Sequence, residues 1–138
     1  MMDNNSIQLI DFQVHGDKRG QMIVAEGLKD IPFKIARIFY MYGSDQKTVR
    51  GQHANRRSEF VLINVCGTSR VKVTNGRIER SFDLDRPNVG IYLPKMVWKE
   101  MYAFSEDSIL LCLASEPYDA AEYIRDYNEY LREMQKHE

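Results

Sequence analysis

Short apolar runs separated by turn residues dominate the first 114 residues of the chain. The runs are rich in Ile, Val, Phe and Tyr, and turn residues recur about every 8–12 positions, as in strands joined by short turns. Within one run, Val71 and Val73 alternate with polar residues, so one face of that strand is expected to meet water. The pattern predicts strands between about residues 7 and 114, at residues 7–12, 21–26, 35–42, 59–65, 69–74, 77–84, 90–93, 98–102 and 109–114.

Asn75 and Gly76 form the strongest turn signal in this region. Both residue types tolerate the positive φ of a tight hairpin turn, so the strands on either side are expected to pair. Many short strands with no long helix between them favour an antiparallel sandwich or jelly roll. We therefore expect an all-β fold in a single domain spanning residues 1–138.

The C-terminal part of the chain has a different periodicity. From Ala120 to Met134 apolar residues recur at spacings of three and four, which makes one apolar stripe on a helix. Asp119 and Glu122 resemble a capping box at its start. We predict a C-terminal α-helix at about residues 118–135 whose stripe packs on the sandwich or on a second subunit. A cofactor-binding role for its tyrosines is the alternative.

Composition places the chain among ordinary folded domains. It has 138 residues, of which 43% are hydrophobic and 28% charged, so disorder along its whole length is excluded. The net charge of −1 offers no basic excess for a phosphate backbone, and we expect no nucleic-acid partner. The longest apolar run is about six residues, far below the roughly 20 that a membrane-spanning helix needs, and we expect no membrane partner.

The N-terminus and the cysteines bear on the cellular compartment. Residues 1–5 contain neither the basic nor the apolar region of a signal peptide, and we expect none. Cys66 and Cys112 both lie in apolar runs, which is typical of buried free thiols in a cytosolic protein. We therefore expect a cytoplasmic location.

A polar cluster around His53 is the main chemical signal. Residues Arg50 to Asn55 have the sequence Arg-Gly-Gln-His-Ala-Asn and lie just before the strand expected at residues 59–65. Alternation places His53 and Asn55 on the same face. A single histidine at the start of a strand is as compatible with polar packing as with function, so the surrounding motif has to decide between them.

The spacing around His53 resembles the two sequence motifs of the cupin superfamily. In metal-binding cupins these motifs supply two histidines, a glutamate and a later histidine, the last one five residues after a proline. The matching positions here are His53, Asn55, Glu59 and Lys99, with Pro94 as the proline. Asn is a poor transition-metal ligand, and a protonated Lys brings positive charge to the place of the cation. The resemblance therefore implies the jelly-roll fold, and we expect no metal.

A second motif, Asp17-Lys18-Arg19-Gly20, lies near the N-terminus. On its own, a charged turn that ends in glycine is only a turn. The dTDP-sugar 3,5-epimerases, which are also cupins, carry a similar Asp-x-Arg-Gly whose arginine helps to hold the pyrophosphate of a nucleotide sugar. The planar fork of Arg offers paired donors to phosphate oxygens. This resemblance implies a substrate-binding role for Arg19.

The most extensive resemblance is to the dTDP-4-oxo-6-deoxyglucose 3,4-ketoisomerases, small dimeric cupins from the pathways to 3-amino-3,6-dideoxyhexoses in bacterial surface glycans. It covers nearly the whole chain. It implies a homodimeric enzyme that moves the keto group of a dTDP-linked keto-deoxysugar from C4 to C3 without a cofactor. The matching stretches are residues 17–20, 30–35, 37–40, 50–54, 89–92, 97–101, 113–115, 118–119 and 123–127.

Two positions depart from the pattern of these ketoisomerases. The family has histidine at the position of Asn55 and again after Trp98, where this chain has Lys99. Asn can hydrogen-bond a sugar oxygen but cannot act as a base near neutral pH. Two alternatives therefore stay open: a related cupin that isomerises or epimerises another nucleotide sugar, and a non-catalytic cupin that binds nucleotide sugars.

The reaction implied by the resemblance needs a base, a donor for a developing oxyanion and a dry pocket. His53 is the candidate base or proton shuttle. Tyr40 and Lys99 are candidate oxyanion donors, and Lys99 is a candidate base if burial lowers its pKa. The structural alternatives are a core position for Tyr40 and a solvated strand position for Lys99. The candidate substrate-binding residues are Arg19, Arg50, Asn55, Glu59 and Trp98.

Overall fold

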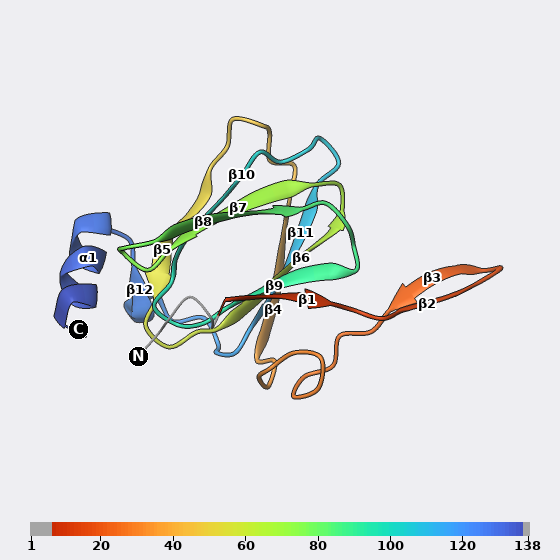
Figure 1. The fold of residues 1–138 in the computed structure, drawn as a ribbon, viewed down its shortest axis with the longest axis horizontal. Helices are drawn as coiled ribbons and strands as arrows, with labels where there is room; N and C mark the ends of the chain where they lie inside the picture. The colour runs from red at the N-terminus through yellow and green to blue at the C-terminus, as the bar shows by residue number, and fades with distance from the viewer. Residues whose placement is uncertain (1–6, 137–138) are drawn as a thin grey trace.

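The computed structural model describes residues 7–136, so the N-terminal residues that bear on a signal peptide lie outside it. The described residues form two five-stranded antiparallel sheets and a separate two-stranded hairpin (Figure 1). One sheet has the order β1 (Gln8–Asp11), β9 (Val89–Leu93), β6 (Phe60–Cys66), β11 (Ile109–Ala114) and β4 (Arg37–Tyr42). The other has the order β12 (Tyr123–Ile124), β5 (Arg50–Asn55), β10 (Trp98–Tyr102), β7 (Ser69–Thr74) and β8 (Glu79–Leu84). This architecture confirms the predicted all-β jelly roll.

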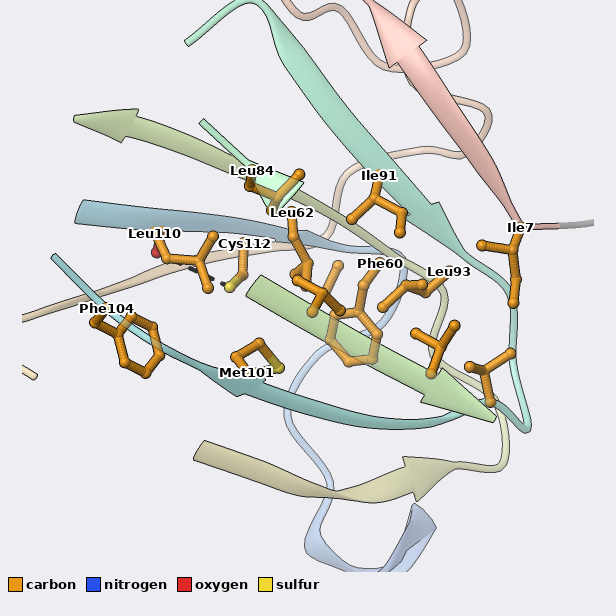
Figure 2. Close-up of a cluster of buried hydrophobic side chains, with 14 residues drawn as sticks. Ile7, Phe60, Leu62, Leu84, Ile91, Leu93, Met101, Phe104, Leu110 and Cys112 are labelled. Atoms are coloured by element: carbon orange, nitrogen blue, oxygen red, sulfur yellow. Dashed lines mark hydrogen bonds between the residues drawn. The ribbon is translucent and has the colours of Figure 1, made fainter. Parts of the chain in front are cut away.

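The core lies between the two sheets, where alternate residues of each strand point inward. Val71 and Val73 of β7 are fully buried, whereas the preceding residue, Arg70, is exposed, as the alternation predicts. Burying one large apolar side chain contributes roughly 1.5–3 kcal/mol, so this cluster is what holds the sheets together. Figure 2 shows this cluster, with Ile7, Phe60, Leu62, Leu84, Ile91, Leu93, Met101, Phe104, Leu110 and Cys112 labelled.

A second apolar cluster lies on the outer face of the β1–β4 sheet. The segment between β1 and β4 crosses this face and covers part of it: Phe12, Ile31 and Phe33 of the segment pack with Val61, Ile63 and Leu113 of the sheet. The edge strand β4 is left uncovered, and its outward side chains Ile38, Tyr40 and Tyr42 are all more than half exposed. In the same segment, β2 (Val14–Asp17) and β3 (Gly20–Ile23) form a hairpin that projects away from the sandwich (Figure 1).

Strand β5 was not among the predicted strands, because its sequence lacks apolar alternation. Gly51 and Gln52 both have positive φ, 85° and 57°. They form a bulge in the pairing with β10: His53 pairs with Lys99, but Gly51 already pairs with the next residue, Glu100. Bulges of this kind re-aim side chains next to functional sites.

The C-terminal helix begins later than predicted. Helix α1 covers Tyr127–Lys136, and Asp126 caps it by accepting a hydrogen bond from the Glu129 amide. The residues before it form a 3-10 turn, η2 (Ala120–Glu122), and then strand β12. The later start of the helix is explained by the free edge of β5. As a strand, Tyr123 and Ile124 pair with the backbone of Asn55 and Ala54, and this pairing would be lost if they were helical.

The apolar stripe of the tail packs on its own sandwich. Tyr130 is fully buried, and its hydroxyl donates to the backbone oxygens of Met96 and Thr74. Trp98 and Ile124 complete this third cluster under the helix. Within residues 7–136, no helix is long and apolar enough to cross a membrane.

Two local predictions were partly right. Asn75 and Gly76 do lie in a hairpin, but the loop between β7 and β8 has four residues. Within this loop, the Asn75 side chain accepts hydrogen bonds from the backbone amides of Arg77 and Ile78. Cys112 is buried as predicted, whereas the prediction is wrong for Cys66, which is exposed. The pairing of β6 with β11 shifts register just before Cys66, so the strand alternation does not continue to this residue.

Candidate active site

A cavity of about 380 Å³ opens between the two sheets, within the size range of small-molecule sites. Its walls are mostly apolar and come from four strands, β4, β6, β10 and β11. Its polar groups come from Lys99 on β10, from strand β5 and from the tail segment before α1. The apolar wall residues are Phe39, Met41, Phe60, Leu62 and Met101.

His53 and Lys99 lie next to each other on neighbouring strands inside this cavity. They are direct partners in the pairing of β5 with β10, and both line the cavity. Their neighbours Ala54 and Trp98 point to the opposite face, into the cluster under the helix. The sheet alternation thus brings together two of the three catalytic candidates.

His53 is neutral across the physiological pH range. Burial, followed by the positive charge of Lys99, lowers the pKa of His53 from 6.5 to about 3. Its ring lies 4.8 Å from the ring of Tyr123, measured between centroids. Its Nδ1 atom is buried without a hydrogen-bond partner among the described residues. His53 lines the cavity, and a neutral imidazole there can donate or accept a hydrogen bond.

Lys99 is buried, with only 2% of its surface exposed. Its Nζ donates to Asn55 Oδ1 at 3.3 Å and lies 4.7 Å from the centroid of the Phe60 ring. Burial lowers the pKa of Lys99 from 10.5 to about 7, against the opposing pull of the Glu122 carboxylate. Near neutral pH this amine can therefore exist with or without its extra proton.

Asn55 and Glu122 form a polar layer beneath Lys99. Both are almost completely buried. The Glu122 carboxylate accepts hydrogen bonds from the backbone amides of Arg57 and Ser58 and from the Ser58 hydroxyl. Burial alone would raise the pKa of Glu122, but these hydrogen bonds outweigh it and hold the pKa below its usual range. Glu122 is therefore a buried, ionised carboxylate.

Arginine and tyrosine side chains lie on the exposed side of the cavity. Arg50 and Arg125 both line it. The Arg125 guanidinium lies 4.7 Å from the centroid of the Tyr123 ring, and the Tyr118 ring lies 5.6 Å from Tyr123. Behind them, Arg37 donates to the Tyr123 hydroxyl at 3.3 Å. Cations next to aromatic rings suit a ligand that joins phosphate groups to a planar base.

Three residues predicted for the site point away from the cavity. Tyr40 is on the outer face of β4, because its neighbours Phe39 and Met41 take the inward positions. Glu59 precedes β6 and accepts a hydrogen bond from the Tyr92 hydroxyl at 2.5 Å, away from the cavity. Trp98 packs under helix α1 and donates to Glu100. Of the residues named from the motifs, His53 and Lys99 line the cavity, whereas Glu59 and Trp98 do not.

Arg19 is also absent from the cavity of its own chain. It sits at the turn of the projecting β2–β3 hairpin, with its side chain 90% exposed. Its contact is an ion pair with Asp17 at 2.6 Å. A role for Arg19 in this chain's own cavity would need the whole hairpin to move.

The cupin metal positions do not suit a cation in this chain. Lys99 brings an ammonium group to one of them, and Glu59 points away from His53. Asn55 offers an amide oxygen that already accepts from Lys99. In the part of the chain that the structure describes, no three His, Cys, Asp or Glu side chains gather closely enough to hold a metal ion.

The sequence analysis missed Tyr123, Arg125 and Glu122 as site residues. All three were placed on a helix, where Tyr123 belonged to the apolar stripe. In the structure Tyr123 faces His53, and its neighbour Ile124 faces the opposite cluster. The alternation of Tyr123 and Ile124 just before Arg125 could have indicated a short strand with one residue facing the site.

Comparisons with known proteins agree on one family. The family described as FdtA: WxcM-like, C-terminal matches residues 5–135. A TDP-4-oxo-6-deoxy-alpha-D-glucose-3,4-oxoisomerase from Aneurinibacillus thermoaerophilus is 37% identical over 94% of this chain and 93% of its own. A 3,4-ketoisomerase from Helicobacter canadensis has a TM-score of 0.92 and 42% identity, covering 94% of this chain and 97% of that one. A sugar 3,4-ketoisomerase from Thermoanaerobacterium thermosaccharolyticum, solved in complex with TDP, has a TM-score of 0.94 and 37% identity, covering 98% of both chains.

Proposed function

Since the chain belongs to the family described as FdtA: WxcM-like, C-terminal, we propose that it is an isomerase that moves the keto group of TDP-4-keto-6-deoxyglucose from C4 to C3. The observation that carries this proposal is the likeness to named 3,4-ketoisomerases over more than nine tenths of the chain. The cavity adds the chemistry: an adjacent imidazole and amine in apolar surroundings, with arginines on the exposed side.

The reaction is an internal hydrogen transfer. The C3 proton is acidic because C3 is next to the C4 carbonyl, so a base can remove it and leave an enediolate. Reprotonation at C4 then gives the 3-keto sugar. One C–H and one O–H bond are lost and one of each is formed, so the chemistry requires no external oxidant or reductant. Cofactor-free catalysis is consistent with this balance.

We propose that His53 and Lys99 act on the reacting carbons. Both lie in the cavity, where apolar walls exclude water and strengthen each charge interaction. His53 stays neutral and can donate to or accept from a sugar oxygen. Asn55 lies behind Lys99 and supports it rather than lining the cavity.

We assign the diphosphate of the substrate to the arginines on the exposed side. Arg50 and Arg125 offer fixed positive charge beside the sugar-sized cavity. The rings of Tyr118 and Tyr123 lie next to them and offer stacking surfaces for the base. This layout follows the order of a nucleotide sugar: hexose inside, diphosphate at the opening and base outside.

A homodimer explains the two exposed features that the single chain leaves unused. Ile38, Tyr40 and Tyr42 form an apolar strip on the edge strand β4. The β2–β3 hairpin projects away from the sandwich with Arg19 at its turn (Figure 1). We propose that a second copy covers the β4 strip and that Arg19 serves the pyrophosphate site of the partner.

The two free cysteines support a cytoplasmic location.

The dimer is tested by sedimentation velocity. Tyr42→Asp puts a charge into the β4 strip, and we expect a monomer where the wild type is a dimer. Ile78→Asp is the matched control, because Ile78 is an exposed apolar residue in the β7–β8 loop. A monomeric wild type, or a dimeric Tyr42→Asp, would remove this assembly.

The activity is tested by proton NMR of TDP-4-keto-6-deoxyglucose incubated with the protein in deuterated buffer. We expect a new 3-keto sugar. Deuterium incorporation with inversion of a ring carbon and no migration of the keto group would indicate an epimerase. Broadened ligand signals with no chemical change would indicate a binding protein.

A further inference from the structure

We propose that Lys99 is the proton shuttle of this site and that the buried Glu122 carboxylate, held beside Asn55, is the positioning residue that controls its charge. The inference rests on the proposed isomerase function and assigns the proton transfer within it. It gives a role to a buried carboxylate that the sequence analysis placed at a helix cap.

Lys99 has the position for this role, and its Nζ has unused hydrogen-bond donors. It is the direct cross-strand partner of His53 and lines the cavity. An ammonium group has three donors. Among the described residues, Lys99 makes one hydrogen bond, to Asn55 Oδ1, while the Phe60 ring covers one side of Nζ. The group is thus held at one point and keeps donors, or a lone pair when neutral, for a ligand.

Glu122 is fixed so that it influences Lys99 without pairing with it. Three hydrogen bonds from Arg57 and Ser58 hold its carboxylate in place. The Asn55 side chain contacts Lys99 through its oxygen, and its buried Nδ2 has no hydrogen-bond partner among the described residues. Glu122 is held beside Asn55, because Tyr123 pairs with Asn55 in the sheet and the Arg56 amide donates to the Glu122 backbone oxygen. A direct ion pair would lock Lys99 in the ammonium form. A separated carboxylate only partly offsets the cost of burial.

The other groups that face Lys99 do not take over this control. His53 on β5 is neutral, because burial and Lys99 itself lower its pKa to about 3. Cys112 on β11 is a neutral thiol, because burial raises its pKa to about 12. Arg125 adds positive charge beside His53, and Arg50 adds it beside Cys112. In the described part of the chain, Glu122 is therefore the ionised acid that acts on Lys99.

The proton steps balance with these groups alone. The neutral amine of Lys99 takes the C3 proton, and the C3–H electron pair forms the C3–C4 double bond while O4 becomes negative. The hydroxyl proton moves from O3 to O4, with the neutral imidazole of His53 as the adjacent relay. The Lys99 ammonium then protonates C4 as the C3 carbonyl forms, which restores the neutral amine.

The test compares pH–rate profiles of four variants and the wild type. The amine must be neutral to start, so kcat/KM of the wild type, which reports the free enzyme, should rise with pH through a midpoint near 7. Lys99→Arg keeps a positive charge that cannot be lost, and we expect a loss of about 10²–10⁴-fold in kcat with TDP affinity retained. Glu122→Gln removes the charge that favours the ammonium, so the midpoint should move to lower pH with KM little changed. Glu122→Asp should restore the wild-type midpoint.

Glu133→Gln is the matched control. Glu133 lies on α1 and pairs with Arg56 at 2.7 Å, so this change loosens the same tail without touching the layer beneath Lys99. Its kcat and midpoint should equal those of the wild type. Full kcat in Lys99→Arg, or an unmoved midpoint in Glu122→Gln, would overturn the inference while leaving the isomerase function intact.

A second measurement separates the inference from the function. Carbon-13 NMR of the lysine ε-carbons follows the titration of Lys99 without turnover. A midpoint near 7 that falls in Glu122→Gln supports control by Glu122, even if no isomerisation is seen and the proposed function fails. A midpoint near that of an exposed lysine, about 10.4, would overturn the inference whatever the activity. This titration also decides the case in which a variant folds but is inactive.

Discussion

Replacing Lys99 with methionine should make the protein more stable, although it removes a proposed catalytic group. The side chain is 2% exposed, and its ammonium has one hydrogen-bond partner among the described residues. Methionine has a similar length and flexibility and no charge to bury. Replacing a buried charge with an apolar group of similar volume is often neutral or stabilising.

The size of the gain follows from the proton affinity of Lys99. Burial lowers its pKa from 10.5 to about 7, which corresponds to roughly 5 kcal/mol of unfavourable free energy when the group is charged in the folded state. The variant also leaves Asn55 Oδ1 unpaired, which costs about 1–3 kcal/mol. Below about pH 7, where Lys99 is charged in the folded state, we therefore expect a net gain of about 2–4 kcal/mol in the free energy of unfolding.

The stability gained in Lys99→Met depends on pH, and the direction of this dependence is part of the prediction. The folded state disfavours the ammonium, so the penalty is complete below about pH 7 and fades as pH rises toward the unfolded-state pKa of 10.5. Lys99→Met should therefore gain stability at pH 6 and little or none at pH 10. Urea unfolding, followed by the fluorescence of the one tryptophan, Trp98, measures both. Lys95→Met, at an exposed lysine, is the control. Equal loss of stability in Lys99→Met at both pH values would refute a buried ammonium.

Four further variants test other parts of the account. His53→Asn should lower kcat by about 10²–10⁴-fold, measured by NMR of product formation, because it removes the imidazole beside the reacting carbons; an unchanged kcat would exclude His53 from the chemistry. Arg50→Ala and Arg125→Ala should each weaken TDP binding by roughly 1.5–3 kcal/mol in calorimetry, since charge-assisted hydrogen bonds are lost; unchanged affinity in both would move the diphosphate elsewhere. Tyr130→Phe should lower the free energy of unfolding by about 1–3 kcal/mol, because its hydroxyl serves two backbone oxygens; thermal unfolding at the wild-type temperature would show that these bonds contribute nothing.

The strands were predictable where burial imposes a simple period. Val71 and Val73 alternate with polar residues because one face of β7 is buried. Strand β5 escaped prediction because its shape depends on the Gly51–Gln52 bulge and on pairing with β10, neither of which leaves an apolar pattern. The tail escaped for the opposite reason. Its helical spacing is genuine from Tyr127 onward, but the free edge of β5 draws the preceding residues into a strand.

The site was predictable in its motif and not in its orientations. His53 and Lys99 could be named together because both stand at cupin motif positions, and the structure pairs them on adjacent strands. Tyr40 was misplaced by one residue of alternation, since Phe39 faces the cavity instead. The role of Glu122 depends on contacts with Ser58, 64 residues away, which no local pattern encodes.

The central claim is that this chain moves a carbonyl group between neighbouring sugar carbons. TDP-4-keto-6-deoxyglucose labelled with carbon-13 at C4 tests it directly, because one NMR signal reports the fate of that carbon. The account predicts that incubation with the wild-type protein converts the labelled signal from a carbonyl to an alcohol carbon. A label that remains a carbonyl after prolonged incubation, with or without exchange at C3, would contradict the account.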